Sequence, residues 1–547
     1  MILLSTFLLS IFVTMALIPV FSRFAVRMHA LDVPDWIKVH DQPIPRVGGL
    51  AMAIGAMVSA LLWIQSGNFV HAYLIGVSII VLVGLLDDIK GIDYRAKFAG
   101  QIAAALILIF VGGIKITTLG TLLPENVVLP DWFAIPFTLV VIVGVTNAIN
   151  LADGLDGLAG GISLLSLACL AYLAFLEGDT LITLLAVSLS GAILGFLRFN
   201  TFPATVFMGD TGSQLIGFSV IALTLNLTQG QTPLSQVLPL LVIGFPILDT
   251  VTVMVERLVQ RRPLFVADKN HLHHKLIGLG LFQTEAVLTI YVLQSAFVVS
   301  AFVFRFYSEW LILSLYLSLS LFLVGGLLLG ERKKWRFKRE GLFDRVIKGR
   351  LKTLRERGVF IRLSFGFVWI GLPLLLGVTC LLPGNIPGSL AVPCAIAGGA
   401  VAFGHLIKKP WGRWVLVTIL YLFIPFIVFF AETQRGPWVV NGYEKLYNTS
   451  YVFLALCVVL TLKLTKRRQG FRLTPTDFLI LFMVLGVSLL PGDYAKEYHL
   501  GTIAARIATL FFSYEVLIGE LRDKLGPLSW STVAALFLVA GRSLAGV

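Results

Sequence analysis

The chain has 547 residues, of which 57% are apolar and only 13% are charged, and its mean hydropathy is +0.90. Soluble domains carry about 25% charged residues, so this composition excludes a soluble globular protein and predicts an all-α, polytopic membrane protein. The formal net charge is +13, but the Lys and Arg residues gather between the apolar runs. There they set membrane topology and attract anionic membrane lipids, and we expect no nucleic-acid partner.

Apolar runs of the length that crosses a bilayer, about 20 residues each, occur about eleven times before residue 330. In chain order they cover about residues 2–22, 48–66, 72–86, 97–113, 133–149, 160–176, 181–197, 214–228, 236–255, 287–305 and 310–329. A strongly basic stretch follows, and we interpret residues 331–357 as a cytoplasmic connector. About seven further apolar runs lie in residues 358–547. The sequence therefore predicts a first membrane domain, 1–330, and a second multi-span region, 358–547, in which no motif indicates a function.

A polar stretch, Thr146–Ala159, interrupts two apolar runs. Asn147, Asn150, Asp153 and Asp156 follow one another at steps of three, so they line one face if the segment is helical. The glycines among them would let a ligand approach the backbone. The alternative is a helix cap and turn between two spans. A ladder of four polar side chains at a membrane boundary favours a binding site.

Topology gathers further polar residues on the same side of the membrane. The positive-inside rule places the loops after the odd-numbered runs in the cytoplasm, and these loops carry Asp87, Asp88, Asp210 and a histidine cluster, with Asp249 near the inner end of the ninth run. Each motif taken alone has an alternative explanation: a solvated helix end for Asp87 and Asp88, a plain turn around Asp210, and a zinc site for the histidine cluster. Acids that converge with histidines and basic residues indicate a site for Mg²⁺ and a phosphorylated substrate, because Mg²⁺ prefers oxygen ligands and substrate phosphates.

Five motifs, taken together, resemble one enzyme family. They are Pro45–Ala51, Leu86–Asp88, Asn147–Gly157, Phe207–Ser213 and His271–His274. Their order and their cytoplasmic placement are similar to those of the polyprenyl-phosphate N-acetylhexosamine-1-phosphate transferases, which include the WecA-, TagO- and MraY-type enzymes. The resemblance covers about residues 1–330, and it implies the eleven-span architecture counted above. The forms Pro-Arg-x-Gly-Gly and His-x-His-His resemble the WecA/TagO branch more than the MraY branch.

The resemblance implies an activity. Such enzymes transfer an N-acetylhexosamine 1-phosphate, here most simply GlcNAc 1-phosphate, from a UDP-sugar to undecaprenyl phosphate and release UMP. This step starts the synthesis of lipid-linked cell-envelope glycans such as O-antigen, at the cytoplasmic face of the bacterial inner membrane. Mg²⁺ is the implied cofactor, with Mn²⁺ as a substitute. A homodimer and a phospho-MurNAc-pentapeptide donor remain open alternatives.

The resemblance also implies roles for individual residues. Asp210 resembles the metal-binding Asp, assisted by Asn150, and Asp87 resembles the base that positions the lipid phosphate, with Asp88 beside it. The remaining residues that it assigns to substrate binding are Asn147, Asp153, Gly154, Leu155, Asp156, Phe207, His271, His273, His274, Arg46 and His40. Among these, Gly154–Asp156 and Phe207 resemble the uracil pocket, the histidines resemble the diphosphate contacts, and Asp153 has the least defined role.

A transporter is the rival class, because many spans and acidic residues near the membrane would suit one. Transporter acids should lie near the bilayer centre and repeat between halves of the chain. Here they lie at one boundary of the first half only, and we find no internal repeat. A catalytically inactive scaffold is a third reading, which the intact acidic motifs disfavour.

Overall fold

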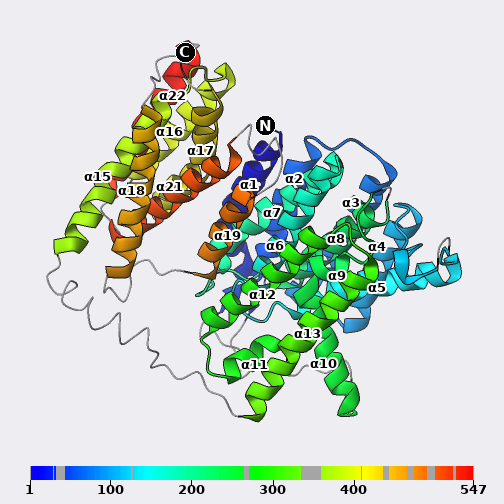
Figure 1. The fold of residues 1–547 in the computed structure, drawn as a ribbon. Helices are drawn as coiled ribbons and strands as arrows, with labels where there is room; N and C mark the ends of the chain where they lie inside the picture. Colours follow the sequence, from blue (N-terminus) through cyan, green and yellow to red (C-terminus); the bar gives the residue numbers. More distant parts are fainter. Residues whose placement is uncertain are drawn as a thin grey trace. The chain divides into compact units, whose positions relative to one another are not determined.

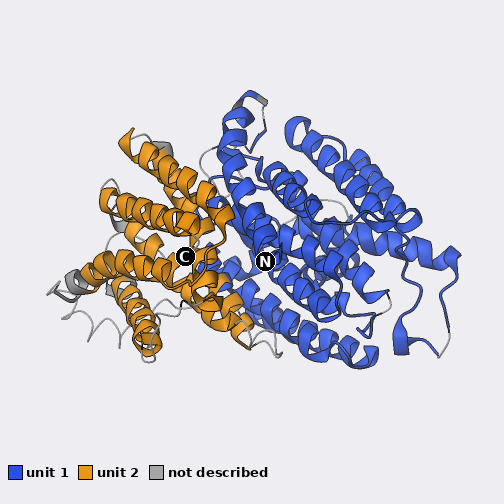
Figure 2. Cartoon of the chain, turned by 90° about the horizontal axis from the view of Figure 1, so that it is seen from above, with its two compact units in different colours: residues 1–337, 474–479 blue, residues 338–473, 480–547 orange. Residues whose placement is uncertain are grey.

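The computed structural model describes residues 2–28, 30–32, 43–124, 127–230, 232–263, 270–333, 359–407, 410–434, 436, 443–464, 474–489, 499–521 and 525–545. The chain divides into two compact units, residues 1–337 with 474–479 and residues 338–473 with 480–547 (Figure 2). The predicted connector, 331–357, lies outside the described residues apart from its first three. Its role as a cytoplasmic link stays a prediction.

Helices build the first unit (Figure 1). In chain order they are α1 (Ile2–Met28), α2 (Gly48–Leu61), α3 (Asn68–Lys90), α4 (Tyr94–Phe110), η1 (Gly120–Leu122), α5 (Asp131–Leu151), α6 (Leu158–Leu176), α7 (Thr180–Asn200), α8 (Gly209–Thr228), α9 (Pro239–Val242), α10 (Gly244–Val259), α11 (Leu272–Gly278), α12 (Gln283–Phe304) and α13 (Glu309–Arg332). Twelve helices of the described chain, counted over both units, are long and apolar enough to cross a membrane. The prediction of an all-α, polytopic membrane protein is confirmed.

The core of the first unit lies around α6 and α7. In their apolar windows 83% and 78% of the residues are buried, against 39% in α1 and α3. Small residues let α1 pack closely on α7: a Cβ on Gly191 would approach the carbonyl oxygen of Phe7 to 2.5 Å, and one on Gly195 would approach that of Ile11 to 2.9 Å. Close approach of backbones is the usual way in which membrane helices gain packing contacts. The central helices therefore form a rigid support for the loops at their ends.

The ninth predicted span is not one helix. It is broken after α9, and α10 begins at Gly244. The side chain of Gln294 from α12 takes the place of the lost helical bonds: its amide nitrogen donates to the carbonyl of Val242 (2.8 Å), and its oxygen accepts from the backbone N–H of Phe245 (3.0 Å). A break inside a membrane segment is tolerated where another helix satisfies the freed backbone groups.

The polar ladder is helical only in its first half. Helix α5 ends at Leu151, and residues 152–157 form turns. Gly157 has φ +81°, a left-handed conformation that favours glycine and ends a helix. Asp153 and Asp156 therefore do not share a helical face with the two asparagines. The condition for one shared face, a helix through the whole stretch, is therefore met only as far as Leu151, because these glycines favour a turn over continued helix.

The second unit contains α15 (Val359–Leu381), η2 (Gly388–Leu390), α16 (Ala391–Leu406), α17 (Pro410–Thr433), α18 (Tyr443–Leu464), α21 (Leu500–Leu521) and α22 (Gly526–Ala545), and α19 (Pro475–Leu489) contributes to both units. A buried ion pair joins Arg506 of α21 to Glu432 of α17, and Arg506 also donates to the Asn448 side chain of α18 (2.6 Å). This pairing ties three helices together inside the bundle, and it needs no ligand to explain it.

Candidate active site

Asp88 holds the first turn of α8. One carboxylate oxygen accepts from the backbone N–H of Asp210 (2.9 Å), and the other accepts from the N–H (3.0 Å) and the hydroxyl (2.6 Å) of Thr211. These amides lie at a helix N-terminus and would otherwise lack partners. Gly209 has φ +66°, and a Cβ there would overlap the Asp88 carboxylate. Glycine is thus required at 209, and Asp88 sets where Asp210 lies.

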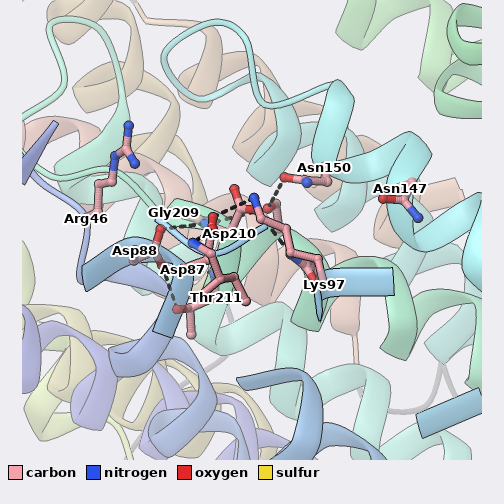
Figure 3. A network of polar contacts seen from close by, with 12 residues as sticks. Arg46, Asp87, Asp88, Lys97, Asn147, Asn150, Gly209, Asp210 and Thr211 are labelled. Carbon is pink, nitrogen blue, oxygen red and sulfur yellow. Dashed lines mark hydrogen bonds and ion pairs between the residues drawn. The ribbon is translucent and has the colours of Figure 1, made fainter. Parts of the chain in front are cut away.

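Lys97 joins two of the predicted acids. Its Nζ lies 2.6 Å from Oδ2 of Asp87 and 2.8 Å from Oδ2 of Asp210 (Figure 3). The other oxygen of Asp87 accepts from the backbone N–H of Ile92 (2.9 Å). Residues from α3, α4 and α8 therefore meet at one cationic nitrogen. Two carboxylates that face each other at such distances repel unless a cation lies between them.

A chain of buried amides supports this centre. Asn147 donates to the side-chain oxygen of Gln101 (2.7 Å), Gln101 donates to Gln214 (3.1 Å), and Gln214 donates to Oδ2 of Asp210 (3.1 Å). Gln101 and Gln214 are 2% and 0% exposed. Buried polar groups that satisfy one another in this way fix side-chain positions. Asn147 thus acts on Asp210 through two glutamines, and Figure 3 shows it well apart from Lys97.

The segment of residues 45–49, from the end of β2 to the start of α2, packs on the segment that precedes α8. The backbone N–H of Phe207 donates to a carbonyl of residues 45–49 (2.8 Å), which places Phe207 beside the start of α8. Arg46 forms an ion pair with Asp32, and the two short strands β1 (Leu31–Asp32) and β2 (Ile44–Pro45) pair antiparallel next to it. Arg46 lies apart from Lys97 in Figure 3. His40 lies outside the described residues.

The turn at residues 152–157 contributes two acids in different environments. An oxygen of Asp156 accepts from the backbone N–H of Ala204 (2.9 Å), so Asp156 fixes the loop that follows α7. Burial, reinforced by the negative charges of Asp210 and Asp156, raises the pKa of Asp153 to about 7. Leu155 is 5% exposed and packs in the core. Asp153 can therefore gain a proton near neutral pH.

The histidine cluster lies against the same turn. A Cβ on Gly154 would overlap the ring of His273, so only glycine lets the two segments meet. The ring centroids of His271 and His274 lie 5.8 Å and 4.2 Å from that of His273. Nε2 of His273 is buried without a hydrogen-bond partner, and burial lowers the pKa of His273 to about 3. A neutral imidazole with an unsatisfied nitrogen beside Gly154 is ready to bind a polar ligand group.

Comparison of the sequence with known proteins assigns the chain to a family. Residues 70–228 match the family model described as glycosyl transferase family 4. The chain is 37% identical over 320 residues to a probable undecaprenyl-phosphate N-acetylglucosaminyl 1-phosphate transferase of Bacillus subtilis, covering 58% of this chain and 89% of that protein. The chain belongs to this family.

Two further relatives extend the comparison. The undecaprenyl-phosphate alpha-N-acetylglucosaminyl 1-phosphate transferase of Escherichia coli K12 is 32% identical, over 65% of this chain and 96% of its own length. A decaprenyl-phosphate N-acetylglucosaminephosphotransferase of Mycobacterium leprae is 34% identical, over 49% of this chain and 75% of its own length. These alignments leave a large part of the chain outside the likeness. The predicted resemblance to polyprenyl-phosphate N-acetylhexosamine-1-phosphate transferases is confirmed, and the chain is a multi-pass membrane transferase of that family.

The donor set suits a hard cation. Asp87 and Asp210 already hold the ammonium of Lys97 between them, and Asn150 lies nearby, its side-chain oxygen accepting from the hydroxyl of Ser213 (2.7 Å). Across the described residues, no group of three or more His, Cys, Asp and Glu side chains is placed to hold a metal ion by itself. An oxygen site with few protein ligands is what Mg²⁺ uses when substrate phosphates complete its coordination.

Lys97, Gln101, Thr211 and Gln214 were not predicted as site residues. Lys97 begins the fourth predicted span, and Gln101 follows one turn later on the same helical face. A charged and an amide side chain at that spacing inside an apolar run is a signal that could have identified both. The roles of Thr211 and Gln214 depend on contacts between distant segments, which hydropathy does not reveal.

Proposed function

We propose that this protein transfers N-acetylglucosamine 1-phosphate from UDP-N-acetylglucosamine to undecaprenyl phosphate and releases UMP. The observation that carries the proposal is the near full-length similarity to relatives named for this transfer, 89% and 96% of whose lengths are aligned. Relatives named for N-acetylglucosamine favour this donor over a MurNAc-pentapeptide nucleotide. The product, a sugar linked to the lipid through a diphosphate, would begin a cell-envelope glycan.

The reaction joins two anions. A phosphate oxygen of the lipid attacks the phosphorus that bears the sugar, and the bond from that phosphorus to the bridging oxygen breaks, so the electron pair leaves with UMP. The nucleophile is already ionised, so positioning and charge neutralisation should supply most of the rate enhancement. The contacts of Lys97 with two carboxylates support a role for its ammonium in this neutralisation.

We assign metal binding to Asp210 with Asn150, and positioning of the lipid phosphate to Asp87. Bound Mg²⁺ would stabilise negative charge on the diphosphate and the departing UMP, and Mn²⁺ should substitute for it. Asp88 accepts three hydrogen bonds from the start of α8, which favours a positioning role for it over direct proton transfer.

Nucleotide and diphosphate binding is assigned to the two segments that meet at Gly154. The 152–157 turn with Phe207 would hold the uracil, and His271, His273 and His274 would donate to diphosphate oxygens. The buried, unpartnered Nε2 of His273 supports a ligand at this point. The basic loops between spans support a cytoplasmic orientation of the site in a bacterial inner membrane.

The test is UMP release by purified protein supplied with Mg²⁺, undecaprenyl phosphate and a panel of UDP-N-acetylhexosamines. We expect release with UDP-N-acetylglucosamine, dependent on the lipid and abolished by a chelator. No release with any sugar would refute the proposed function. A truncated chain that ends before residue 338 then tests the domain assignment, because retained activity would place the transferase in the first unit.

A further inference from the structure

The histidine-bearing helix α11 is short and is held at two points by α10. At the first point, Asp249 is 1% exposed: its Oδ2 lies 2.8 Å from Nδ1 of His271, and its Oδ1 accepts from the backbone N–H of Leu272 (2.7 Å). At the second point, Lys275 forms an ion pair with Glu256. The two acids are seven residues apart, so they lie on one face of α10.

The other face of α10 is apolar and exposed. Val251, Val255 and Leu258 are 50%, 52% and 62% exposed, which suits contact with lipid. Helix α10 therefore presents acids toward α11 and hydrocarbon away from it. The acids are not scattered charges at a membrane boundary, because each has a partner on the histidine segment.

The contact with Asp249 fixes which imidazole nitrogen is free. A carboxylate acceptor at Nδ1 requires a proton on that nitrogen, so Nε2 is the atom that remains for a ligand. The ring of His271 lies almost parallel to that of His273 (13°), which in turn lies against Gly154. The orientation of His271 thus affects His273, which contacts the turn at residues 152–157.

We infer that Asp249 is a positioning residue of the transfer reaction, which holds His271 with Nε2 available to the diphosphate of the sugar nucleotide. The inference rests on the proposed function, because it needs a diphosphate substrate at the histidines. In this inference Asp249 acts only through His271. Changing Asp249 should therefore cause no further loss of activity in a protein that already lacks His271.

A purely structural role is the competing explanation, since Asp249 also caps α11. Asp249→Asn separates the two, because the side-chain oxygen of Asn can still accept from the backbone N–H of Leu272, but the side chain brings no negative charge to Nδ1. The matched control is Glu256→Gln, which weakens the second tie between α10 and α11 and leaves His271 untouched. Each variant is checked for an unchanged thermal unfolding temperature in detergent.

The experiment is a double-mutant cycle on kcat/KM for UDP-N-acetylglucosamine, with Asp249→Asn, His271→Ala and the double variant. We expect Asp249→Asn to lose about 10–100-fold, by analogy with the carboxylates that orient metal-ligating histidines. The double variant should be no worse than His271→Ala within about twofold, and Glu256→Gln should lose less than about threefold. If Asp249→Asn does not fold, Asp249→Glu replaces it in the same cycle.

Two results would overturn the inference. Losses that multiply in the double variant would show that Asp249 acts independently of His271. An equal loss in Glu256→Gln would show that any loosening of α11 is sufficient. Both differ from failure of the proposed function itself, in which the unmodified protein releases no UMP from any UDP-sugar and the inference falls with it.

Discussion

Replacing Gly209 by alanine tests how Asp88 places the first turn of α8, to which we assign metal binding. A left-handed φ costs an L-residue about 1–2 kcal/mol, and Gly209 has φ +66°. The added Cβ would also displace the Asp88 carboxylate, which accepts three hydrogen bonds from Asp210 and Thr211. A hydrogen bond that involves a charged group contributes about 1.5–3 kcal/mol.

The φ cost lowers stability, whereas loss of a single such bond would cost about 1.5–3 kcal/mol, or about 10–150-fold in rate if it falls on the transition state. The assay is UMP release by Gly209→Ala, with thermal unfolding measured in parallel. Gly113→Ala is the matched control: Gly113 has φ +74° but no neighbouring atom within 4 Å of an added Cβ. It should lower stability slightly and keep full activity. Equal activity losses in the two variants, or none in Gly209→Ala, would refute the reasoning.

Two further predictions concern charge at the site. Lys97→Met leaves Asp87 and Asp210 facing each other without the ammonium, so we expect an activity loss of about 100-fold or more. Addition of Mg²⁺ should also raise the unfolding temperature of this variant more than that of the unmodified protein. An equal rise would count against a cation position shared by Lys97 and Mg²⁺. The folded-state pKa of Asp153 is about 7 against an ordinary 3.8, so the folded protein binds the proton more tightly and loses stability as pH rises from about 4 to 7. At pH 8 in a chelator, Asp153→Asn should therefore have a free energy of unfolding higher than that of the unmodified protein by about 1–2 kcal/mol, after allowance for partial exposure. This gain should vanish near pH 4. A gain that does not change with pH would contradict this.

Hydropathy alone located the apolar helices, because the length and composition of an apolar run are local properties, but only twelve helices of the described residues, against about eighteen predicted spans, are long and apolar enough to cross a membrane. The acids and histidines were also found from the sequence, since polar residues at a membrane boundary stand out against their surroundings. What the sequence could not provide was their division of labour. Asp87 and Asp88 are neighbours, yet one contacts Lys97 and the other caps α8, a difference that arises only when α3, α4 and α8 pack.

The contact of Gly154 with His273 shows the same limit. The two residues are far apart in sequence, and neither has a pattern that indicates the other. The spacing of the ladder at 147–156 fits a helix whereas its glycines favour a turn, so the sequence alone did not decide between the two. Local spacing singled out the candidate residues, and tertiary packing decides which contacts each one makes.

The central claim is that Asp210 is the metal-binding residue of a sugar-phosphate transferase, and Asp210→Ala tests it most directly. The measurement is the rate of UMP release from UDP-N-acetylglucosamine with undecaprenyl phosphate and saturating Mg²⁺, for a variant whose unfolding temperature is unchanged. We predict a loss of at least about 100-fold, because removing a metal ligand costs several kcal/mol of transition-state stabilisation. A fully active Asp210→Ala protein would contradict the assignment of the site.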